Sequence, residues 1–340
     1  MSNILVTGGA GYIGSHTSRT LQDKGFKPII LDNLVYGHEY IREKLNNVIL
    51  IKGDIGDKYL LQKIFKDFSI EAIIHFAAYA YVGESIKDPM KYYQNNVLSS
   101  INLIDQIIDF SSKKKESPPP IVFSSSCATY GIPKILPINE NTPQFPINTY
   151  GNTKLIIEKV LKDYGLAYGL SSISFRYFNA AGASSDGLLG ENHNPETHLI
   201  PLALKATDIN SKPLIIYGND YPTKDGTCIR DYIHVEDLAK AHIIGLEKLI
   251  KSKKRITENY NLAMGKGFSV MDIIKSVERV TNKKVNYIFG ERRVGDPDKL
   301  IADASKAHDH LNWKAEYTEI DTIIKHAWNW HKKLNSFKSS

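Results

Sequence analysis

Cysteine is scarce in this 340-residue chain, which contains only Cys127 and Cys228. At most one disulfide could form, so the chain cannot be a disulfide-stabilised scaffold. Two cysteines this far apart also lack the spacing of a metal-binding motif, and no metal ion is expected. A reducing compartment, and therefore the cytoplasm, is the predicted location.

Long hydrophobic runs are also missing. No stretch of about 18 apolar residues occurs in the sequence, which argues against a membrane-spanning helix. The first residues lead directly into the apolar triplet at 4–6, without the basic segment and apolar stretch of a secretory signal. These absences predict a soluble chain that does not associate with a membrane.

Neither sign of charge dominates, because 43 basic residues are interspersed with 37 acidic ones and the net charge is +6. The two densest basic runs, residues 113–115 and 251–255, contain no interleaved aromatic side chains. They are typical of solvated loops, so no nucleic-acid surface is expected. The modest positive excess suits an anionic small-molecule substrate.

Short apolar runs alternate with helical patterns in the first half of the chain. Strands are predicted at residues 4–6, 28–32, 48–52, 72–76, 121–124 and 172–177, and helices at residues 12–24, 58–68, 89–109 and 150–164. Residues 111–120 form the most loop-like stretch. The alternation predicts an α/β fold, a Rossmann-type doubly wound parallel sheet, over residues 1–178.

After residue 178 the pattern loosens, and turn-rich segments occur at residues 186–197 and 218–227. Helical patterns return at residues 199–209, 235–249, 270–281 and 319–331. We therefore expect a smaller, mixed α/β substrate domain over residues 179–340.

A glycine-rich turn follows the first strand. Gly9, Gly11 and Gly14 fit the pattern G-x-G-x-x-G, whereas Gly8, Gly11 and Gly14 fit its G-x-x-G-x-x-G variant. Glycine is needed because a pyrophosphate must approach the backbone closely at the start of a helix. Asp32 ends the second strand, where a carboxylate can bind the adenosine ribose and repel a 2′-phosphate. The pattern predicts a dinucleotide site that prefers NAD to NADP.

Asp54 ends the third strand and is a further candidate ligand of the dinucleotide. From this position its side chain could accept a hydrogen bond from adenine. An ordinary loop aspartate is an equally good interpretation, and spacing alone does not separate the two.

A serine, a tyrosine and a lysine form a candidate catalytic group. Ser126 ends a run of three serines after the fifth strand, and Tyr150 and Lys154 lie on one helix face. A tyrosine beside an ammonium and a nicotinamide cation should have its pKa lowered from about 10 towards neutrality. It can then take a proton from a sugar hydroxyl, oriented by Ser126, while hydride leaves the same carbon. Lys154 could also bind the nicotinamide ribose.

With these motifs in place, the sequence resembles the UDP-glucose 4-epimerase family of the extended short-chain dehydrogenase/reductase superfamily. The similarity runs from the glycine turn to residue 313. It is carried by residues 75–78, 82–85, 92–96, 176–179, 217–223, 225–227, 230–235 and 292–296. The resemblance implies tightly held NAD, oxidation of a UDP-sugar at C4, rotation of the 4-keto sugar and hydride return to its other face.

The resemblance also implies a set of site residues. The catalytic residues would be Tyr150 as the base, Lys154 and Ser126. NAD would be bound by Gly8, Gly11, Tyr12, Ile13, Gly14, Asp32, Asn33, Asp54, Ile55, Phe76, Ala77, Ala78, Asn95, Ser124, Tyr150, Lys154 and Tyr177. The UDP-sugar would be bound by Ser126, Asn179, His198, Leu199, Tyr217, Arg230, Arg293, Asp296 and Leu300. A segment near residues 228–262 is expected to return to the NAD-binding domain.

Three departures from the family pattern leave the preferred sugar open. The stretch Ala78-Tyr79-Ala80 lacks a lysine that contacts the hexose in many members. His198 stands where asparagine is common, and Leu300 stands where some members have tyrosine. Because leucine is shorter, an N-acetylated hexosamine could be accepted. Other variant segments resemble epimerases of UDP-pentoses such as UDP-xylose and UDP-arabinose.

Two other functions remain as alternatives. A nucleotide-sugar 4,6-dehydratase would carry an acidic residue after the fifth strand, where this sequence has residues 126–130 without a carboxylate. A catalytically inactive NAD-binding protein would usually have lost Tyr150 or Lys154. The family resemblance further implies a homodimer, formed through the helices that begin at Pro89 and at Tyr150.

Overall fold

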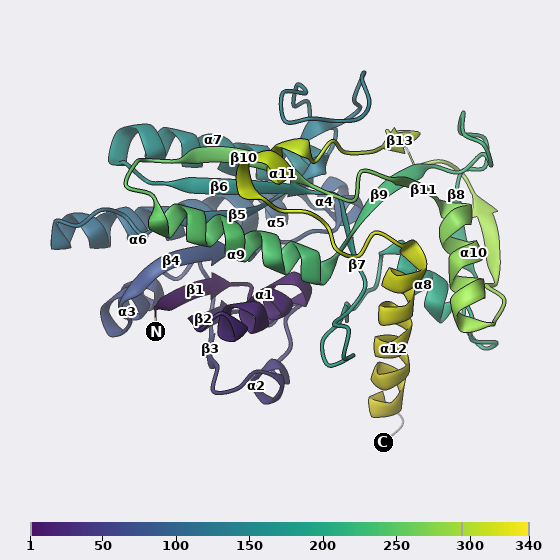
Figure 1. The fold of residues 1–340 in the computed structure, drawn as a ribbon, viewed down its shortest axis with the longest axis horizontal. Coiled ribbons are helices and arrows are strands. Elements are labelled where there is room, and N and C mark those ends of the chain that lie inside the picture. The colour runs from purple at the N-terminus through teal and green to yellow at the C-terminus, as the bar shows by residue number, and fades with distance from the viewer. Residues whose placement is uncertain (1, 294, 339–340) are drawn as a thin grey trace.

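The computed structural model describes residues 2–293 and 295–338; Val294, in one of the segments that carry the family resemblance, lies outside them. A seven-stranded sheet forms the centre (Figure 1). Its order is β10-β6-β5-β4-β1-β2-β3, and every neighbouring pair is parallel. The strands are β1 (Asn3–Thr7), β2 (Lys27–Asp32), β3 (Ile49–Lys52), β4 (Ile70–His75), β5 (Ile121–Ser126), β6 (Ser172–Tyr177) and β10 (Thr257–Leu262).

The central strands are apolar over their full length because helices cover both faces of the sheet. Ile4, Leu5 and Val6 of β1 are completely buried, so no polar face alternates with the apolar one. The chain runs from β1 outward to β3 and then crosses to β4 on the other side of β1. This reversal between β1 and β4 opens the position at the carboxyl ends of the strands where doubly wound sheets bind ligands.

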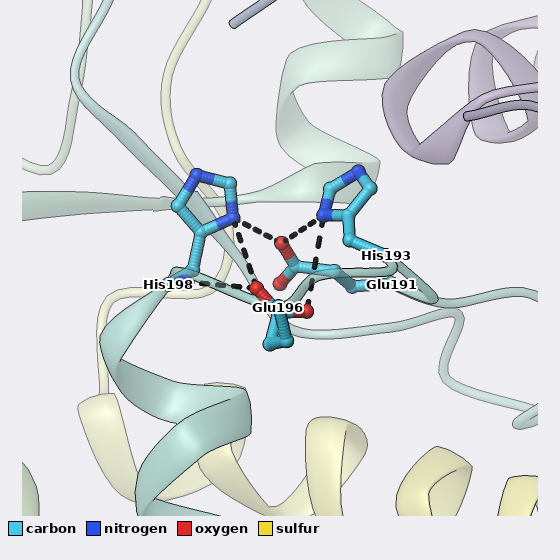
Figure 2. A group of neighbouring side chains, drawn as sticks. All are labelled: Glu191, His193, Glu196 and His198. Carbon is cyan, nitrogen blue, oxygen red and sulfur yellow. Dashed lines mark hydrogen bonds and ion pairs between the residues drawn. The ribbon is translucent and has the colours of Figure 1, made fainter. Parts of the chain in front are cut away.

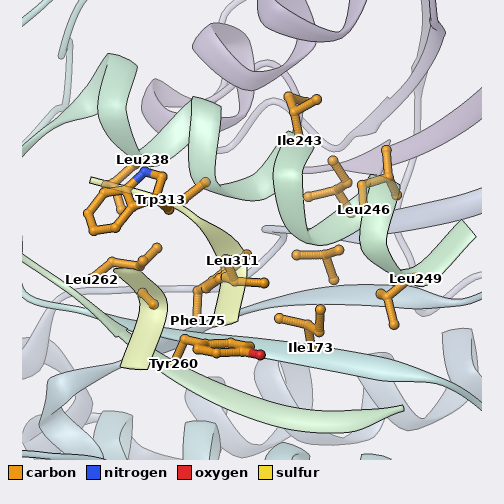
Figure 3. Packing of buried hydrophobic residues seen from close by; sticks show 14 of the residues in the cluster. Ile173, Phe175, Leu238, Ile243, Leu246, Leu249, Tyr260, Leu262, Leu311 and Trp313 are labelled. Atoms are coloured by element: carbon orange, nitrogen blue, oxygen red, sulfur yellow. The ribbon is translucent and has the colours of Figure 1, made fainter. Parts of the chain in front are cut away.

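Helices form a layer on each face of the sheet. One layer contains α1 (Tyr12–Asp23), α9 (Val235–Lys251) and α11 (Ser305–Leu311), and Figure 3 shows Leu238 and Leu246 of α9 directed at the strand residues beneath them. The other layer contains α3 (Lys58–Asp67), α6 (Ser99–Lys114) and α7 (Thr149–Tyr168). The predicted Rossmann-type sheet is therefore confirmed.

A smaller mixed α/β part lies at one end of the sheet (Figure 1) and has its own core, which includes Ile273 and Ile323. One of its sheets joins β7 (Asn179–Ala181), β9 (Ile229–His234), β11 (Gly267–Ser269) and β13 (Lys299–Leu300). A second pairs β8 (Leu214–Tyr217) with β12 (Tyr287–Gly290). Its helices are α8 (Leu199–Lys205), α10 (Val270–Thr281) and α12 (Ile320–Lys338). No helix of the described chain is long and apolar enough to cross a membrane.

The helix predicted at residues 89–109 differs from the observed structure. It is divided into α5 (Pro89–Tyr92), a π-helical segment (Tyr93–Leu98) and α6, which continues to Lys114. The prediction of a loop from residue 111 is wrong, because Ser111 is buried and donates a hydrogen bond to Ile107 O one turn earlier. The following lysines extend the helix where cations interact favourably with its dipole.

A buried ion pair joins α7 to the sheet. The Arg176 guanidinium on β6 forms three hydrogen bonds to the Glu158 carboxylate, the shortest of 2.6 Å. Only 3% and 5% of the two side chains are exposed. The Ser125 hydroxyl at the end of β5 donates a further hydrogen bond of 2.5 Å to Glu158. Glu158 therefore fixes one face of α7 against two strands.

Replacing Glu158 with alanine should lower the free energy of unfolding by about 3–5 kcal/mol, because Arg176 would remain buried without its carboxylate. Chemical denaturation followed by circular dichroism measures this loss. Glu247→Ala is the control, since Glu247 pairs with Lys251 on an exposed helix surface and should cost less than about 1 kcal/mol. Equal losses in the two variants would contradict the importance of the buried pair.

Candidate active site

The glycine turn between β1 and α1 is packed too closely for side chains at three of its positions. Gly8 has a φ of +70°, and a Cβ there would lie 2.6 Å from Ala77 N. A Cβ on Gly14 would lie 2.2 Å from Gly8 O. Gly11 differs, because a Cβ there would meet only Gly8 O, at 3.4 Å. A Cβ on Gly9 would lie 2.9 Å from Ile30 Cγ2. The turn itself therefore requires Gly8, Gly9 and Gly14, whereas Gly11 borders space that a ligand can use.

The start of α1 is suited to an anion. Gly11 is the N-cap residue, no side chain caps the helix, and no acidic residue lies in its first turn. The first N–H groups of a helix lack intrahelical partners and carry partial positive charge, which favours a phosphate. Tyr12 points elsewhere, since its hydroxyl donates to Gly182 O in the smaller part of the protein. Ile13 packs on the core beside the sheet.

Asp32 and Asp54 lie at the ends of neighbouring strands, as the pattern predicts. The buried Asp32 carboxylate accepts hydrogen bonds of 2.9 Å from Ala10 N and from Leu34 N. Burial raises the pKa of Asp32, although these hydrogen bonds oppose the shift. Asn33 donates to Asp54 with a distance of 2.8 Å. This edge of the sheet therefore gathers carboxylate and amide oxygens that can accept hydrogen bonds from an adenosine.

Five further dinucleotide candidates lie in three environments. Phe76 N and Ala77 N both donate to Thr7 O, which holds the residues after β4, including Ala78, against the glycine turn. Asn95 lies in the π-helical segment and donates to the Asn96 side chain. Ile55 belongs to the core, so only its main chain could contact a ligand.

Ser124, Lys154 and Tyr177 are joined at the carboxyl ends of β5 and β6. The Lys154 ammonium group is almost completely buried and donates a hydrogen bond of 2.7 Å to Ser124 O. The Ser124 and Tyr177 hydroxyls share a short hydrogen bond. Tyr150 lies one helical turn before Lys154, and the Lys154 Nζ atom is 5.7 Å from the centre of its ring. A hydrogen bond also joins Tyr150 to Ser126, so the structure brings the predicted group of Ser126, Tyr150 and Lys154 together.

The predicted fall in the pKa of Tyr150 is not found in the protein alone. Burial raises the pKa of Tyr150, the nearby Tyr177 adds to the increase, and a hydrogen bond with Ser126 opposes it. Burial also lowers the pKa of Lys154 to about 7, against the influence of Glu158. The predicted fall included the positive charge of the nicotinamide beside Tyr150, so it stays a prediction for the protein with NAD bound. A low pKa at Tyr150 thus requires a positive charge that the chain itself does not supply.

Several substrate candidates gather around β9. Arg230 donates to Asp296 over 2.6 Å, and Leu300 of β13 pairs with Arg230 in the sheet register. Leu300 also packs against the small core cluster that contains Tyr130. The Arg230 guanidinium partly opposes the rise in the pKa of the buried Cys127, the residue after Ser126. Arg230 therefore lies close enough to act electrostatically on the end of β5.

The other substrate candidates lie in separate groups. Arg293 is stacked over the Tyr217 ring, with 4.1 Å between the guanidinium carbon and the ring centre. The Asn179 side chain donates to Asp231 O on β9. His198 is the N-cap residue of α8, and Leu199 begins that helix. These three groups make no direct contact with the Tyr150 group among the interactions of the described residues.

Sequence reasoning missed two residues that position the catalytic helix. The buried Ser85 hydroxyl accepts a hydrogen bond from Tyr150 N. Asn96 donates to Thr153 of α7 and to Tyr79 O after β4. Both residues lie in segments that carry the family resemblance, but neither belongs to a motif with a recognisable spacing. Their contacts with α7 join residues 57 or more positions apart, so the local sequence could not predict them.

Known proteins resemble this chain over nearly its whole length. The sequence matches the family model described as GDP-mannose 4,6 dehydratase over residues 5–327. A UDP-glucose 4-epimerase of Lactobacillus helveticus is 47% identical over 329 residues, which cover 97% of each chain. The crystal structure of the UDP-glucose 4-epimerase from Brucella ovis in complex with NAD is 46% identical, with a TM-score of 0.89 over 96% of this chain and 98% of that one. That of the enzyme from Bifidobacterium longum in complex with NAD+ and UDP is 38% identical, with a TM-score of 0.90 over 98% of each.

The parallel sheet, the glycine turn at its switch point and the Ser–Tyr–Lys group define an extended short-chain dehydrogenase/reductase. Within this class, full-length relatives at 40–47% identity share one name and one reaction type. The chain belongs to the UDP-glucose 4-epimerase family.

The different packing at Gly11 and Gly14 can be tested directly. Gly11→Ala should fold normally, because its extended backbone suits alanine, yet weaken NAD binding by roughly tenfold or more, about 1.4 kcal/mol. Gly14→Ala should instead destabilise the fold by about 1–3 kcal/mol through overpacking. Thermal unfolding and calorimetric titration of cofactor-stripped protein with NAD separate the two effects. Unchanged NAD affinity in a folded Gly11→Ala protein would remove this turn from the NAD site.

Proposed function

We propose that this chain catalyses the NAD-dependent 4-epimerisation of a UDP-sugar, with UDP-galactose and UDP-glucose as its substrates. The observation that carries the proposal is the joined group of Tyr150, Lys154 and the serines of β5, in a chain of this family. The uncapped start of α1 and the free space beside Gly11 suit the NAD pyrophosphate. The carboxylate of Asp32 suits its ribose.

Bound NAD would supply the chemistry of accepting a hydride from C4 of the sugar and returning it. The Tyr150 oxygen would take the proton from the C4 hydroxyl as that carbon is oxidised, and would give it back when the 4-keto group is reduced. Ser126 would orient the hydroxyl through its own oxygen. Because burial keeps the Tyr150 proton in place, the phenol would act as a base only beside a positive charge.

The nucleotide part of the substrate would be bound away from the reacting carbon. Arg230 and Arg293 offer guanidinium groups that can form paired hydrogen bonds to a diphosphate. Asp296 already orients Arg230, and Tyr217 supports Arg293. Binding energy from UDP would hold the substrate while the hexose turns. Asn179, His198 and Leu199 would complete this binding surface.

We also propose that residues 1–178 form the NAD-binding domain and residues 179–340 mainly the UDP-sugar domain. The segment near residues 228–262 would return to the first domain. This division is supported by β10, which pairs with β6, and by α9, which packs on the core of the large sheet.

A homodimer in the cytoplasm is the proposed state of the enzyme. Large apolar side chains are exposed along the segment around Pro89 and along α7, including Met90, Leu98, Leu166 and Tyr168. A partner subunit would remove such surface from water. The two cysteines are unpaired, which suits a reducing compartment.

The dehydratase alternative is disfavoured by the residues after β5. Elimination needs an acid and a base near C5 and C6, but the segment Cys127–Tyr130 contains no carboxylate. An inactive NAD-binding protein is disfavoured because Tyr150 and Lys154 are both retained and held together. An epimerase that also accepts N-acetylated hexosamines is favoured by one observation, the small Leu300 side chain beside the Tyr130 cluster.

Tyr150→Phe tests the assigned base. Conversion of UDP-galactose, followed by NMR of the anomeric protons without added cofactor, should fall about 10²–10⁴-fold. Tyr168→Phe, on the exposed end of the same helix, should retain full activity. Full turnover by the Tyr150→Phe protein would refute the assignment, and no turnover by the unaltered protein even with NAD supplied would refute the epimerase function.

Leu300→Tyr tests the sugar preference. A larger side chain should reduce conversion of UDP-N-acetylgalactosamine relative to UDP-galactose by roughly tenfold or more. Leu300→Met, which conserves volume, should leave the ratio unchanged. Parallel NMR assays with UDP-arabinose identify a pentose-specific enzyme. If Leu300→Tyr changed no substrate ratio, Leu300 would not border the sugar.

A further inference from the structure

Four side chains of one short loop converge before α8. Glu191, His193, Glu196 and His198 each direct one nitrogen or oxygen atom to a common point, and these atoms all lie within 4.8 Å of one another (Figure 2). The two imidazoles flank the two carboxylates, and in both rings the Nδ1 atom faces inward. None of the dinucleotide contacts described above uses this cluster, and it takes only the Nδ1 atom of His198, which leaves Nε2 available to the proposed UDP-sugar surface.

The spacing of the four side chains is close to that of a tetrahedral site. Zinc lies about 2.0–2.2 Å from nitrogen and oxygen ligands, so neighbouring ligands of a tetrahedral site are about 3.3–3.5 Å apart. The Nδ1 atom of His193 is 3.1 Å from a Glu191 oxygen and 3.8 Å from Glu196 Oε2, and the Nδ1 atom of His198 is 3.7 Å from Glu196 Oε1. To hold one ion, Glu196 would use a single oxygen, the closer contact between His198 and Glu191 would open, and the atoms that now lie up to 4.8 Å apart would move together.

His193 points to a missing partner at the centre of the cluster. Its Nδ1 atom is screened from water and forms no hydrogen bond with any described residue, although a Glu191 oxygen lies 3.1 Å away. A buried polar atom without a partner costs free energy. The lone pair of a neutral imidazole directed at two carboxylates is the arrangement that a cation would satisfy.

The loop that carries the cluster is fixed from several sides. The Trp330 indole of α12 donates to Glu191 O over 2.8 Å. The Glu196 carboxylate accepts hydrogen bonds from the main-chain N–H groups of Thr197 and His198. The His193 ring packs edge-on against Tyr12 of α1. Ligands held in advance lose little freedom when an ion binds.

We propose that Glu191, His193, Glu196 and His198 form a binding site for one divalent transition-metal ion, with zinc as the best match. Two neutral imidazoles and two carboxylates would balance the two charges of the ion. Imidazole ligands disfavour magnesium and calcium, which prefer oxygen, and a closed set of four protein ligands is typical of a structural site. The ion would fix the start of α8 against α1. The sequence analysis predicted no metal ion from the spacing of the two cysteines, and neither cysteine belongs to this cluster.

The site is tested with tag-free protein, because an affinity tag binds metals itself. Elemental analysis should find close to one zinc per chain, or chelator-treated protein should take up one equivalent in calorimetric titration with Zn²⁺. His193→Gln and Glu191→Gln should weaken binding by at least the roughly 10–100-fold that follows loss of an outer-shell partner. His308→Gln is the control, since His308 is an exposed histidine beside a carboxylate.

Equal zinc affinity in the unaltered protein and in folded His193→Gln protein would overturn the proposal. Circular dichroism establishes whether each variant is folded. If neither variant folds, titration of the unaltered chelator-treated protein with Co²⁺ decides: a visible absorption band typical of tetrahedral cobalt, saturating at one equivalent, supports the site. No such band would mean that the four side chains form only an ion-pair network.

Discussion

Tyr150, Lys154 and Glu158 occupy successive turns on one face of α7, and the anchoring of this face to the sheet determines the geometry of the whole site. Glu158 is fixed by the buried Arg176, and Lys154 is fixed by the carbonyl of Ser124. The position of Tyr150 is fixed by the same helix and by Ser85, whose hydroxyl accepts a hydrogen bond from Tyr150 N. The phenol therefore stands at the carboxyl end of β5, where the switch point of the sheet opens.

Burial shifts the pKa values of Tyr150 and Lys154. Removal from water raises the pKa of Tyr150 and lowers that of Lys154 to about 7, so in the protein alone Tyr150 keeps its proton and Lys154 is only partly charged near neutral pH. Neither side chain is a strong base or a fixed cation by itself. In the proposed reaction, the positive charge of the nicotinamide of bound NAD would favour the phenolate of Tyr150, which would link proton removal to the presence of the oxidant.

Features with a local cause could be predicted from the sequence. The apolar run of β1, the glycines that follow it and the four-residue spacing of Tyr150 and Lys154 each have one physical explanation and were placed correctly. The π-helical segment could not be predicted, because its Asn96 bonds with residues of two other elements. Strand β10 was also missed, since its buried Asn261 is satisfied by Ile138 and Tyr130, far away in the sequence.

The cluster at residues 191–198 was missed for another reason. Its four side chains lie in a segment with the composition of an ordinary polar loop, and the contacts that fix this loop, including the Trp330 indole and the Tyr12 ring, turn them towards one point. Arg230 and Asp296 are similar, since 66 residues separate two partners that lie side by side. Long-range pairs of this kind depend on the packed fold and leave no periodic signal.

The path of the chain has a consequence for the independence of the two halves. After leaving the large sheet at β6, the chain forms part of the smaller mixed α/β part and then returns to the large sheet, where it supplies α9 and β10. A fragment ending near residue 178 would leave the edge of β6 unpaired and would expose Ile173 and Phe175 to water (Figure 3). The remaining fragment would carry the amphipathic helix α9 without the sheet that covers its apolar face. Because the later part of the chain completes the core of the large sheet, the two parts must fold together as one unit.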